Sequence, residues 1–183
     1  MLRQPRSVRR SVPTSTLQTL VVSLVLSRLD YGNATLVGLP IHLQRRMQSV
    51  PNASARIIFD LRRSDHITDA LASLHWLRVS ERIKYETALL TFRALRGEAP
   101  RYVSDGLVCV ADVSARRRLR SSATTQLMVP AHRLYTIGSR SSPVVAPTLL
   151  NQLPADVTSA SSLPEFHRKL KTHLFKASFP NIV

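Results

Sequence analysis

The 183-residue chain is poor in the residue types that build several common kinds of functional site. Its single cysteine, Cys109, rules out an internal disulfide framework and a cysteine-rich zinc module. The five glycines are scattered, so the sequence has no glycine-rich loop of the kind that holds phosphate groups in nucleotide-binding proteins. Aromatic residues make up 5% of the chain, which limits what base stacking could contribute to nucleic-acid binding.

Acidic residues are also scarce, and their spacing argues against metal-dependent catalysis. None of the eleven is adjacent to another, whereas polymerase and nuclease sites need clustered carboxylates to hold two cations. Asp65 and Asp69 lie four residues apart, but such a pair is typical of a solvated helix start. The six histidines form no i, i+4 pair, and no serine lies in G-x-S-x-G. We therefore expect no catalytic residue, no metal and no cofactor, and we interpret Cys109 as a buried packing residue.

What the chain has in abundance is positive charge. Lysine and arginine total 26 against 11 acidic residues, which gives a formal net charge of +15. Only four of the 26 are lysines, so 22 arginines carry the charge. The planar guanidinium group presents five donors in a fork that matches phosphate, so RNA or DNA is the partner class that the composition favours. The hydrophobic share of 44% is high enough for a folded protein of this length.

The N-terminal segment allows two interpretations. Residues 1–28 are rich in arginine and serine and contain no acid, a composition typical of a mitochondrial transit peptide. A hydrophobic stripe nevertheless recurs at the i, i+3, i+4 spacing of an amphipathic helix, on Leu17, Leu20, Val21, Leu24 and Val25. We favour a packed helix, preceded by a flexible basic segment over residues 1–13. The apolar run is too short to span a bilayer. We expect no membrane partner and favour a nuclear or cytoplasmic location, with a mitochondrial one as the alternative.

Residues 41–59 carry the pattern of a second helix, with an interruption. The stripe steps by three and four residues through Leu43, Met47, Val50, Ser54 and Ile57. Pro51 falls inside it, and an interior proline lacks the N–H that would bond to a carbonyl in the preceding turn, at a cost of about 3 kcal/mol or more. We expect either a kink at Pro51 or two short helices.

Three more helices follow from local patterns. Hydrophobic spacing predicts one over residues 66–75 and a longer one from Ser80 to Leu95, with Gly97 as the residue that ends it. An S-x-x-E capping box, Ser162 with Glu165, opens the last helix. The inward side chains of these helices are predicted to be Ile67, Ala70, Leu71 and Leu74, then Tyr85, Leu89, Phe92 and Leu95, then Phe166, Leu170 and Leu174.

Between residues 104 and 162 the chain is rich in serine, threonine, proline and valine and has no long 3.6-residue period. Two short stretches, 127–130 and 144–146, have the composition of brief strands. The predicted fold class is therefore mainly α, a small helical bundle with an irregular, weakly β segment at 104–162. We expect a helical region at 14–103 and a Ser/Pro-rich region at 104–183 that ends in an amphipathic basic helix.

Several sequence blocks resemble those of a known family. In chain order they are Ser27-Arg-Leu-Asp-Tyr-Gly-Asn33, Gly38-Leu-Pro40, Asn52-Ala-Ser-Ala-Arg56, Asp65-His-Ile67, Leu74-His-Trp-Leu77, Arg82-Ile83, Leu95-Arg-Gly-Glu-Ala-Pro100, Leu119-Arg-Ser-Ser122, Val129-Pro130, Ala146-Pro147, Asn151-Gln-Leu-Pro154, Phe166 and Leu170-Lys-Thr-His-Leu-Phe175. Singly these blocks are weak signals, but their order over residues 14–175 is specific. The chain resembles the C-terminal region of a reverse transcriptase from a non-LTR retrotransposon (LINE) of the jockey and chicken-repeat type.

The resemblance implies the thumb of an RNA-directed DNA polymerase and the region beyond it. The palm's paired aspartates, the nucleotide-binding segments and the endonuclease of a complete element do not occur in this sequence. The implied protein is thus a non-catalytic, thumb-like remnant that contacts nucleic acid. Whether a partner protein supplies reverse transcriptase activity is left open.

The sequence departs from the family pattern at a few positions. Pro51 stands where glutamine is usual, and Leu150 where a tryptophan normally precedes Asn151. Ser139 and Ser142 replace what is usually an aspartate and a phenylalanine. Losing a buried aromatic side chain leaves a cavity that typically costs a few kcal/mol. We therefore expect a fold less stable than that of an intact relative.

Four basic clusters are the candidate phosphate-binding residues. They are Arg45 and Arg46; Arg62 and Arg63; Arg116, Arg117, Arg118 and Arg120; and Arg168, Lys169 and Lys171. Contacts of this kind would be salt-sensitive and nearly independent of base sequence. Two other interpretations stay open: an organelle-targeted protein with an arginine-rich transit segment, and a non-functional, translated transposon relic.

Overall fold

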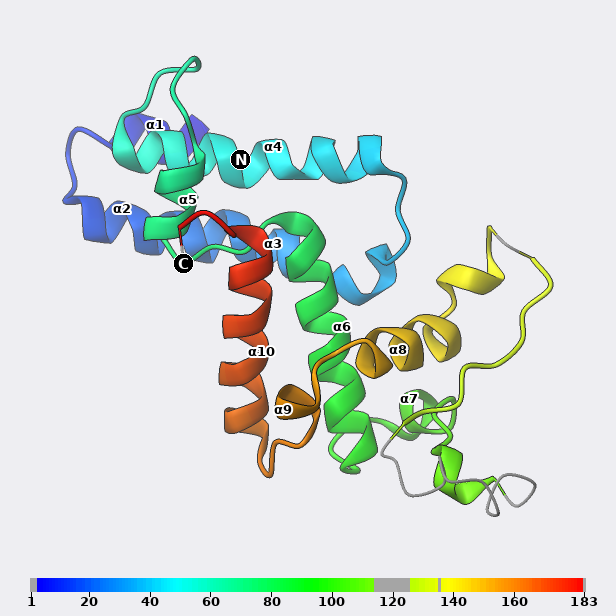
Figure 1. Cartoon of the computed structure of the whole chain (residues 1–183). Helices are drawn as coiled ribbons and strands as arrows, with labels where there is room; N and C mark the ends of the chain where they lie inside the picture. The colour runs from blue at the N-terminus through cyan, green and yellow to red at the C-terminus, as the bar shows by residue number, and fades with distance from the viewer. Residues whose placement is uncertain (1–2, 114–125, 135, 183) are drawn as a thin grey trace. The chain divides into compact units, whose positions relative to one another are not determined.

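The computed structural model describes residues 3–113, 126–134 and 136–182, and this part of the chain is mainly helical (Figure 1). The only β-type pairing in it is an isolated antiparallel bridge between Cys109 and Leu127. The predicted mainly α fold is therefore confirmed. In chain order the elements are α1 (Arg3–Val8), α2 (Thr14–Val21), the π-helical η1 (Val22–Leu26), α3 (Ser27–Asp30), the 3₁₀ turn η2 (Asn33–Leu36), α4 (Ile41–Phe59), α5 (Thr68–Ser73), α6 (Val79–Leu95), α7 (Arg101–Ser104), the 3₁₀ turns η3 (Val110–Asp112) and η6 (Gly138–Arg140), α8 (Ser142–Asn151), α9 (Ala155–Thr158) and α10 (Leu163–Ser178).

The chain divides into two compact units that do not follow the expected boundary at residue 103. Unit 1 consists of Met1–Asn33, Leu39–Arg82 and Leu174–Val183, and unit 2 of Ala34–Gly38 and Ile83–His173. Unit 1 includes the C-terminal segment because Phe179 is buried in its core, while Phe175 packs against that core and stacks on His75 at 5.7 Å. Such non-local packing leaves no mark in local sequence patterns.

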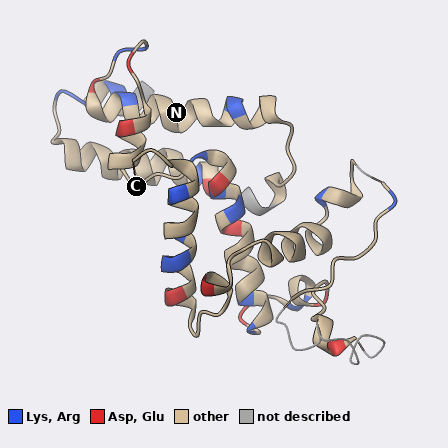
Figure 2. Ribbon diagram, viewed as in Figure 1, with Lys and Arg blue, Asp and Glu red and all other residues tan. Residues whose placement is uncertain are grey.

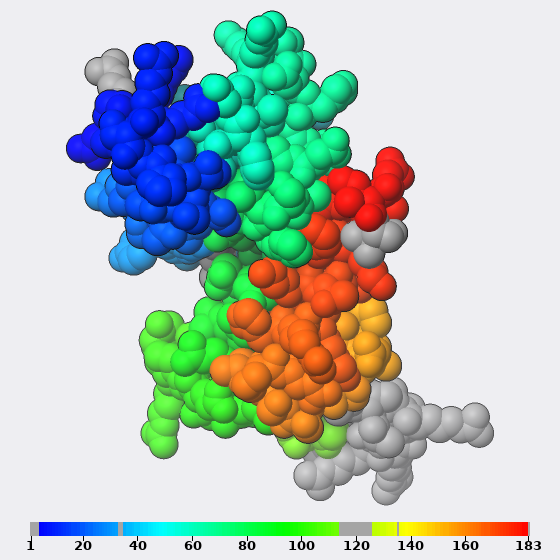
Figure 3. Space-filling model, turned by 90° about the vertical axis from the view of Figure 1, so that its left-hand side faces the viewer, coloured from blue at the N-terminus to red at the C-terminus, as the bar shows by residue number. Residues whose placement is uncertain are grey.

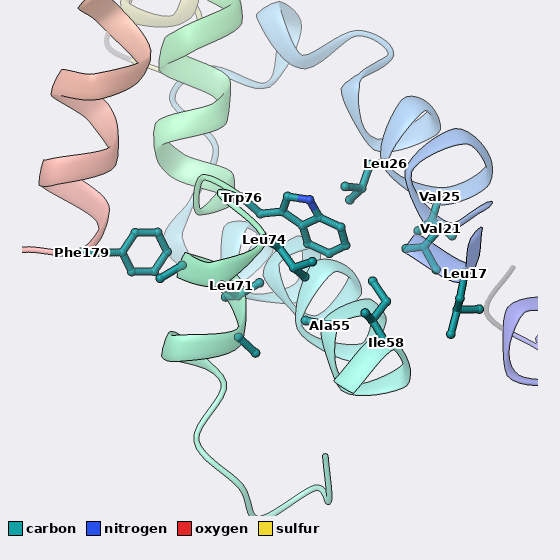
Figure 4. Close-up of a cluster of buried hydrophobic side chains, with 12 residues drawn as sticks. Leu17, Val21, Val25, Leu26, Ala55, Ile58, Leu71, Leu74, Trp76 and Phe179 are labelled. Carbon is teal, nitrogen blue, oxygen red and sulfur yellow. The ribbon is translucent and has the colours of Figure 1, made fainter. Parts of the chain in front are cut away.

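The core of unit 1 is formed by α2, η1, α4 and α5 (Figure 4). Leu17, Val21 and Val25 are buried as predicted, but Leu24 is 41% exposed and Leu26 is buried in its place. The cause is η1, because the i→i+5 bonds of a π-helix insert an extra residue and rotate the following side chains out of the 3.6-residue register.

The N-terminal residues belong to this unit. We expected residues 1–13 to be flexible, whereas Arg3–Val8 forms α1 and Pro5 is buried. Pro5 lies in the first turn of α1, where backbone N–H groups have no intrahelical partner, so its lack of a donor costs little. Figure 3 shows the N-terminal segment (blue) lying against the surface of α4 and the residues that follow it (cyan to teal).

Helix α4 runs through Pro51 as one continuous element, so the predicted alternative of two short helices is wrong. Its buried face consists of Pro51, Ser54, Ala55 and Ile58, whereas Val50 and Ile57 are only half-buried. The helix therefore directs the prolyl ring towards the core. Helix α5 confirms the prediction for residues 66–75, with Ala70, Leu71 and Leu74 buried.

In unit 2, α6 and α10 pack through two aromatic rings. Phe92 and Phe166 stack in nearly parallel planes with their centroids 4.0 Å apart. Gly97 ends α6 with a φ of +73°, as predicted, but Leu95 is 40% exposed instead of buried because it is the last helical residue. Pro100 then precedes the short helix α7.

Helix α10 begins as the capping box predicts. The Oγ atom of Ser162 accepts a hydrogen bond from the Glu165 N–H at 3.4 Å. The Glu165 carboxylate reaches one residue further back than expected, to the N–H and hydroxyl of Ser161, both at 2.9 Å. Phe166, Leu170 and Leu174 are all buried, so the predicted inward face is confirmed.

The predicted strand at 144–146 is wrong, since these residues lie in α8. Pro143 stands in the first turn of that helix, where its fixed φ favours helix formation. Leu150 is buried on α8. Ser142 is exposed at the start of this helix, so serine in place of the family's usual phenylalanine leaves no cavity in the core. Leu127, from the other predicted strand, is buried and forms the bridge to Cys109.

Candidate nucleic-acid interface

In unit 1, four arginine side chains from three segments line one pocket. Arg6 and Arg9 come from α1 and the turn after it, Arg56 from α4, and Arg63 from the loop that follows α4. The pocket has a volume of about 400 Å³, and its other lining residues are Ala53, Ile57, Asp60 and Leu61. Guanidinium groups beside aliphatic side chains suit a ligand that has an anionic group and an apolar body. We call this feature the arginine pocket.

The end of α4 determines where these side chains lie. Asp60 follows the helix in the left-handed region, with φ 58° and ψ 35°, and its N–H donates to the carbonyl of Arg56. Aspartate is one of the few non-glycine residues that adopts this conformation readily. The Leu61 N–H donates to the same carbonyl at 3.1 Å. The chain therefore turns sharply after α4 and places Arg63 beside Arg56.

The loop after α4 is held by two side chains. Arg56 donates through Nε to the carbonyl of Arg62 at 3.3 Å and through Nη2 to the carbonyl of Arg63 at 3.5 Å. The Asp65 carboxylate accepts from the Arg62 N–H at 2.7 Å. Asp65 thus organises a basic loop, a more specific role than the solvated helix start that we expected for it.

Asp60 provides the negative charge of the arginine pocket. Its carboxylate pairs with the Arg9 guanidinium, and the side chains are 74% and 30% exposed. The hydrogen bond from Arg9 and the nearby charges of Arg9 and Arg10 lower the pKa of Asp60 below its ordinary value, and the same pairing raises the pKa of Arg9. Asp60 therefore stays ionised at neutral pH and holds Arg9 in position.

The predicted residues of unit 1 lie near this pocket to different degrees. Arg63 lines it, and Arg62 is the exposed neighbour of Arg63 in the same loop. Arg45 and Arg46 are exposed on the N-terminal half of α4 and do not line the pocket. Figure 2 shows basic residues on α4 and in the loop after it. The structure thus brings one predicted residue into a concave site and leaves three on the surface.

The predicted cluster on α10 is divided by acidic contacts. Arg168 and Lys171 are exposed, but Lys169 pairs with Glu165 at 3.0 Å and Asp156 at 3.3 Å and donates to the Asp156 carbonyl at 3.1 Å. The hydrogen bond from Lys169, together with those from Ser161, lowers the pKa of Glu165 from 4.5 to about 2. Lys169 is thus engaged with acidic partners and is a poor candidate for a phosphate contact. The remaining predicted cluster, Arg116, Arg117, Arg118 and Arg120, lies outside the described residues.

Sequence reasoning missed Arg6, Arg9 and Arg56 as members of a site. Arg6 and Arg9 were assigned to a flexible segment, and Arg56 is an isolated basic residue in its part of the sequence. The i, i+3 spacing of Arg6 and Arg9 was the one local signal that both share a helical face. Their proximity to Asp60, 51 residues beyond Arg9, comes from tertiary packing, which that spacing does not encode.

Other arginines are occupied within the fold. In unit 1, Arg82 forms a bidentate pair with Asp30, which joins the end of α3 to α6. In unit 2, the Arg96 guanidinium lies over the Phe92 ring, 4.6 Å from its centroid, and donates to the carbonyl of Ala160 at 3.0 Å. Net charge therefore overstates the number of basic side chains available to bind a ligand.

The described residues offer little other chemistry. They contain no group of three or more His, Cys, Asp or Glu side chains placed to hold a metal ion. No helix in the described part of the chain has both the length and the apolar character needed to cross a membrane. Cys109 is half-buried, and burial, with a smaller effect of Asp112, raises the pKa of its thiol. A raised pKa disfavours the nucleophilic thiolate.

In comparisons with known proteins, the chain matches no family model, no curated protein and no solved structure.

Proposed function

We propose that this chain is a non-catalytic derivative of the C-terminal region of a non-LTR retrotransposon reverse transcriptase and that it binds RNA or DNA through phosphate contacts. The arginine pocket, which four arginines and one aspartate line together with aliphatic residues, is the observation that carries the binding proposal. Arginine forks bind phosphate oxygens in a bidentate manner, and convergence of several on one site raises affinity for an anion.

The surroundings of the pocket favour a polyanion. Arg62 is exposed beside Arg63 in the loop after α4, and Arg45 and Arg46 are exposed in the same helix as Arg56, eleven and ten residues before it. A chain of phosphates would contact several of these groups at once and would release a counterion at each contact. This arrangement favours a nucleic acid over a small anion as the main partner.

The contacts made by residues in the family-like sequence blocks support the proposed ancestry. Asp30 and Arg82, from two separate sequence blocks, form one bidentate ion pair. Asn151 donates to the carbonyl of Leu127 at 2.8 Å and accepts from its N–H at 2.9 Å. Phe166 and Leu170 are fully buried. These blocks therefore stabilise the fold, as expected for the scaffold part of a polymerase that leaves the chemistry to another region.

The binding proposal predicts a steep salt dependence. Fluorescence anisotropy with RNA and DNA of matched sequence would follow saturable binding. Four ionic contacts in the arginine pocket alone would cost about 50-fold in affinity for a single strand, and about 150-fold for a duplex, between about 50 and 200 mM salt. In the double variant Arg6→Gln/Arg63→Gln, two contacts are lost and the same salt step would cost only about tenfold.

Arg93→Gln/Arg101→Gln is the matched control, since both residues are exposed in unit 2 and neither was a candidate. This control removes the same number of positive charges, and the dependence of affinity on salt concentration should stay mostly unchanged. Absence of binding at about 50 mM salt would refute the proposal. Equal loss of slope in the two double variants would show that total charge, and not the arginine pocket, drives binding.

A further inference from the structure

The arginine pocket is too small for a length of duplex. Its volume of about 400 Å³ lies near the lower end of the range for small-molecule sites, about 300–1,000 Å³. Ala53, Ile57 and Leu61 supply aliphatic surface between the guanidinium groups. A single nucleotide has matching parts, because its base and sugar can cover aliphatic carbon while its phosphate meets the arginines.

The charge of the pocket favours a phosphate that carries two negative charges. The four arginines and one aspartate that line it have an excess of three positive charges, since 4 − 1 = 3. A monoester phosphate at the end of a strand carries between about 1.5 and 2 negative charges at pH 7, whereas an internal phosphodiester carries one. The terminal group therefore gains more from the same set of arginines.

Two pocket arginines are well placed to meet that group. Arg6 and Arg63 are exposed, one on α1 and the other in the loop after α4, so they reach the pocket from different segments. Arg56 is held by the carbonyls of Arg62 and Arg63, which fixes its guanidinium before any ligand arrives. Arg9 is paired with Asp60, so a phosphate must compete with that carboxylate for it.

We infer that the arginine pocket recognises the end of a nucleic-acid strand and holds one terminal nucleotide through its monoester phosphate. Asp60 pairs with Arg9 in the absence of ligand, and the phosphate competes with it for that arginine. This inference rests on the proposed nucleic-acid binding and narrows it. Internal phosphates would contact Arg62, beside Arg63 in the same loop, and then Arg45 and Arg46, about 15 Å along α4 from Arg56, while the terminal group occupies the pocket.

The test compares oligonucleotides that differ only at one end. Twelve-residue single strands of one sequence, as RNA and as DNA, would carry a 5′-phosphate, a 3′-phosphate or neither, with the fluorophore on the opposite end, and anisotropy would be measured at about 50 mM salt. We expect one of the two phosphorylated ends to bind about tenfold more tightly than the unphosphorylated strand, in line with one additional charge-assisted contact.

Two variants and a matched control for each assign the effect to the pocket. Arg6→Gln/Arg63→Gln should remove the preference for the phosphorylated end. Arg45→Gln/Arg46→Gln, with the same change in charge on exposed α4 positions, should weaken all oligonucleotides alike and keep the preference. Asp60→Asn retains a side chain that tolerates the left-handed conformation and should strengthen binding of the phosphorylated end about fivefold. Asp105→Asn, at an exposed position in unit 2, should leave it unchanged.

The outcomes separate the two proposals. Tight, salt-sensitive binding of all oligonucleotides without any end preference would overturn the end-recognition inference and leave the proposed function intact. An end preference that survives Arg6→Gln/Arg63→Gln would place that recognition elsewhere and also overturn the inference. If no oligonucleotide binds, both proposals fail.

Discussion

At the scale of single residues, basic side chains of the same type do different work. Arg82 and Arg96 are engaged in contacts with other residues of the chain, and Lys169 is paired with two acidic neighbours. Arg6 and Arg63 point to a pocket from separate segments. In the sequence, candidate phosphate-binding residues are chosen because basic residues lie close together along the chain, so runs of arginine are preferred over isolated ones. In the structure, the positions of isolated arginines decide which of them converge.

Glu165 predicts a defined pH dependence of stability. Its pKa falls from 4.5 to about 2 in the folded protein, so its contribution to stability is fully present above pH 4.5 and is lost as the pH falls towards 2. The free energy of unfolding, measured by urea titration at several pH values in that window, should fall more steeply for the natural chain than for Glu165→Gln. Glu98→Gln, at an exposed position, is the control. Parallel pH profiles for the natural chain and Glu165→Gln would contradict this account.

At the scale of elements, local sequence signals predicted secondary structure best where the residues that determine an element lie within it or next to it. The Ser162/Glu165 box and the spacing of Phe166 and Leu170 lie in α10 and the residue before it. The start of the helix and its buried face are as predicted, although the Glu165 carboxylate accepts from Ser161. Residues 144–146 read as a strand because valine is common in strands, yet Pro143 and packing place them in α8. The π-helical segment η1 moved the buried face from Leu24 to Leu26, and no residue in that stretch signals such an insertion.

Asn151 should matter more for stability than its exposed position suggests. Its side-chain amide satisfies both backbone polar groups of Leu127, which is 2% exposed. Asn151→Ala leaves both groups without that partner and should lower the free energy of unfolding by about 2–4 kcal/mol. The neighbouring exposed change Gln152→Ala should cost less than about 0.5 kcal/mol. Equal midpoints for the two variants in urea would show that the Leu127 segment does not depend on Asn151.

Pro51 is the second test at this scale. A proline inside a helix removes one backbone hydrogen bond at a cost of about 3 kcal/mol, but its ring is buried in the core face of α4. Pro51→Ala restores the N–H and removes part of that buried surface, so we expect a net gain in stability of about 1–2 kcal/mol. Thermal unfolding measures it, with Ser49→Ala on the exposed face of α4 as the control. A lower melting temperature for Pro51→Ala would mean that packing of the ring outweighs the missing bond.

At the scale of the whole molecule, the summed local patterns predicted the mainly helical fold class, but they did not locate the pocket. The net charge favours a nucleic acid as partner, which stays a prediction. The arginine pocket requires α1, the end of α4 and the loop after it to meet, with Arg9 and Asp60 separated by 51 residues in the sequence. The division into two compact units likewise depends on residues 174–183 returning to unit 1. Both features are set by long-range packing, which local sequence patterns do not encode.

The most direct test of the central claim is to observe the arginines themselves. In protein labelled with ¹⁵N-arginine, the Nε–Hε signals would be assigned with single Arg→Gln variants and followed by NMR during titration with an RNA or DNA strand. The account predicts that the signals of Arg6, Arg9, Arg56 and Arg63 shift first and most strongly, while those of Arg93 and Arg101 stay in place. Unmoved pocket signals in a titration that shifts other arginines, or no shift at all, would contradict it.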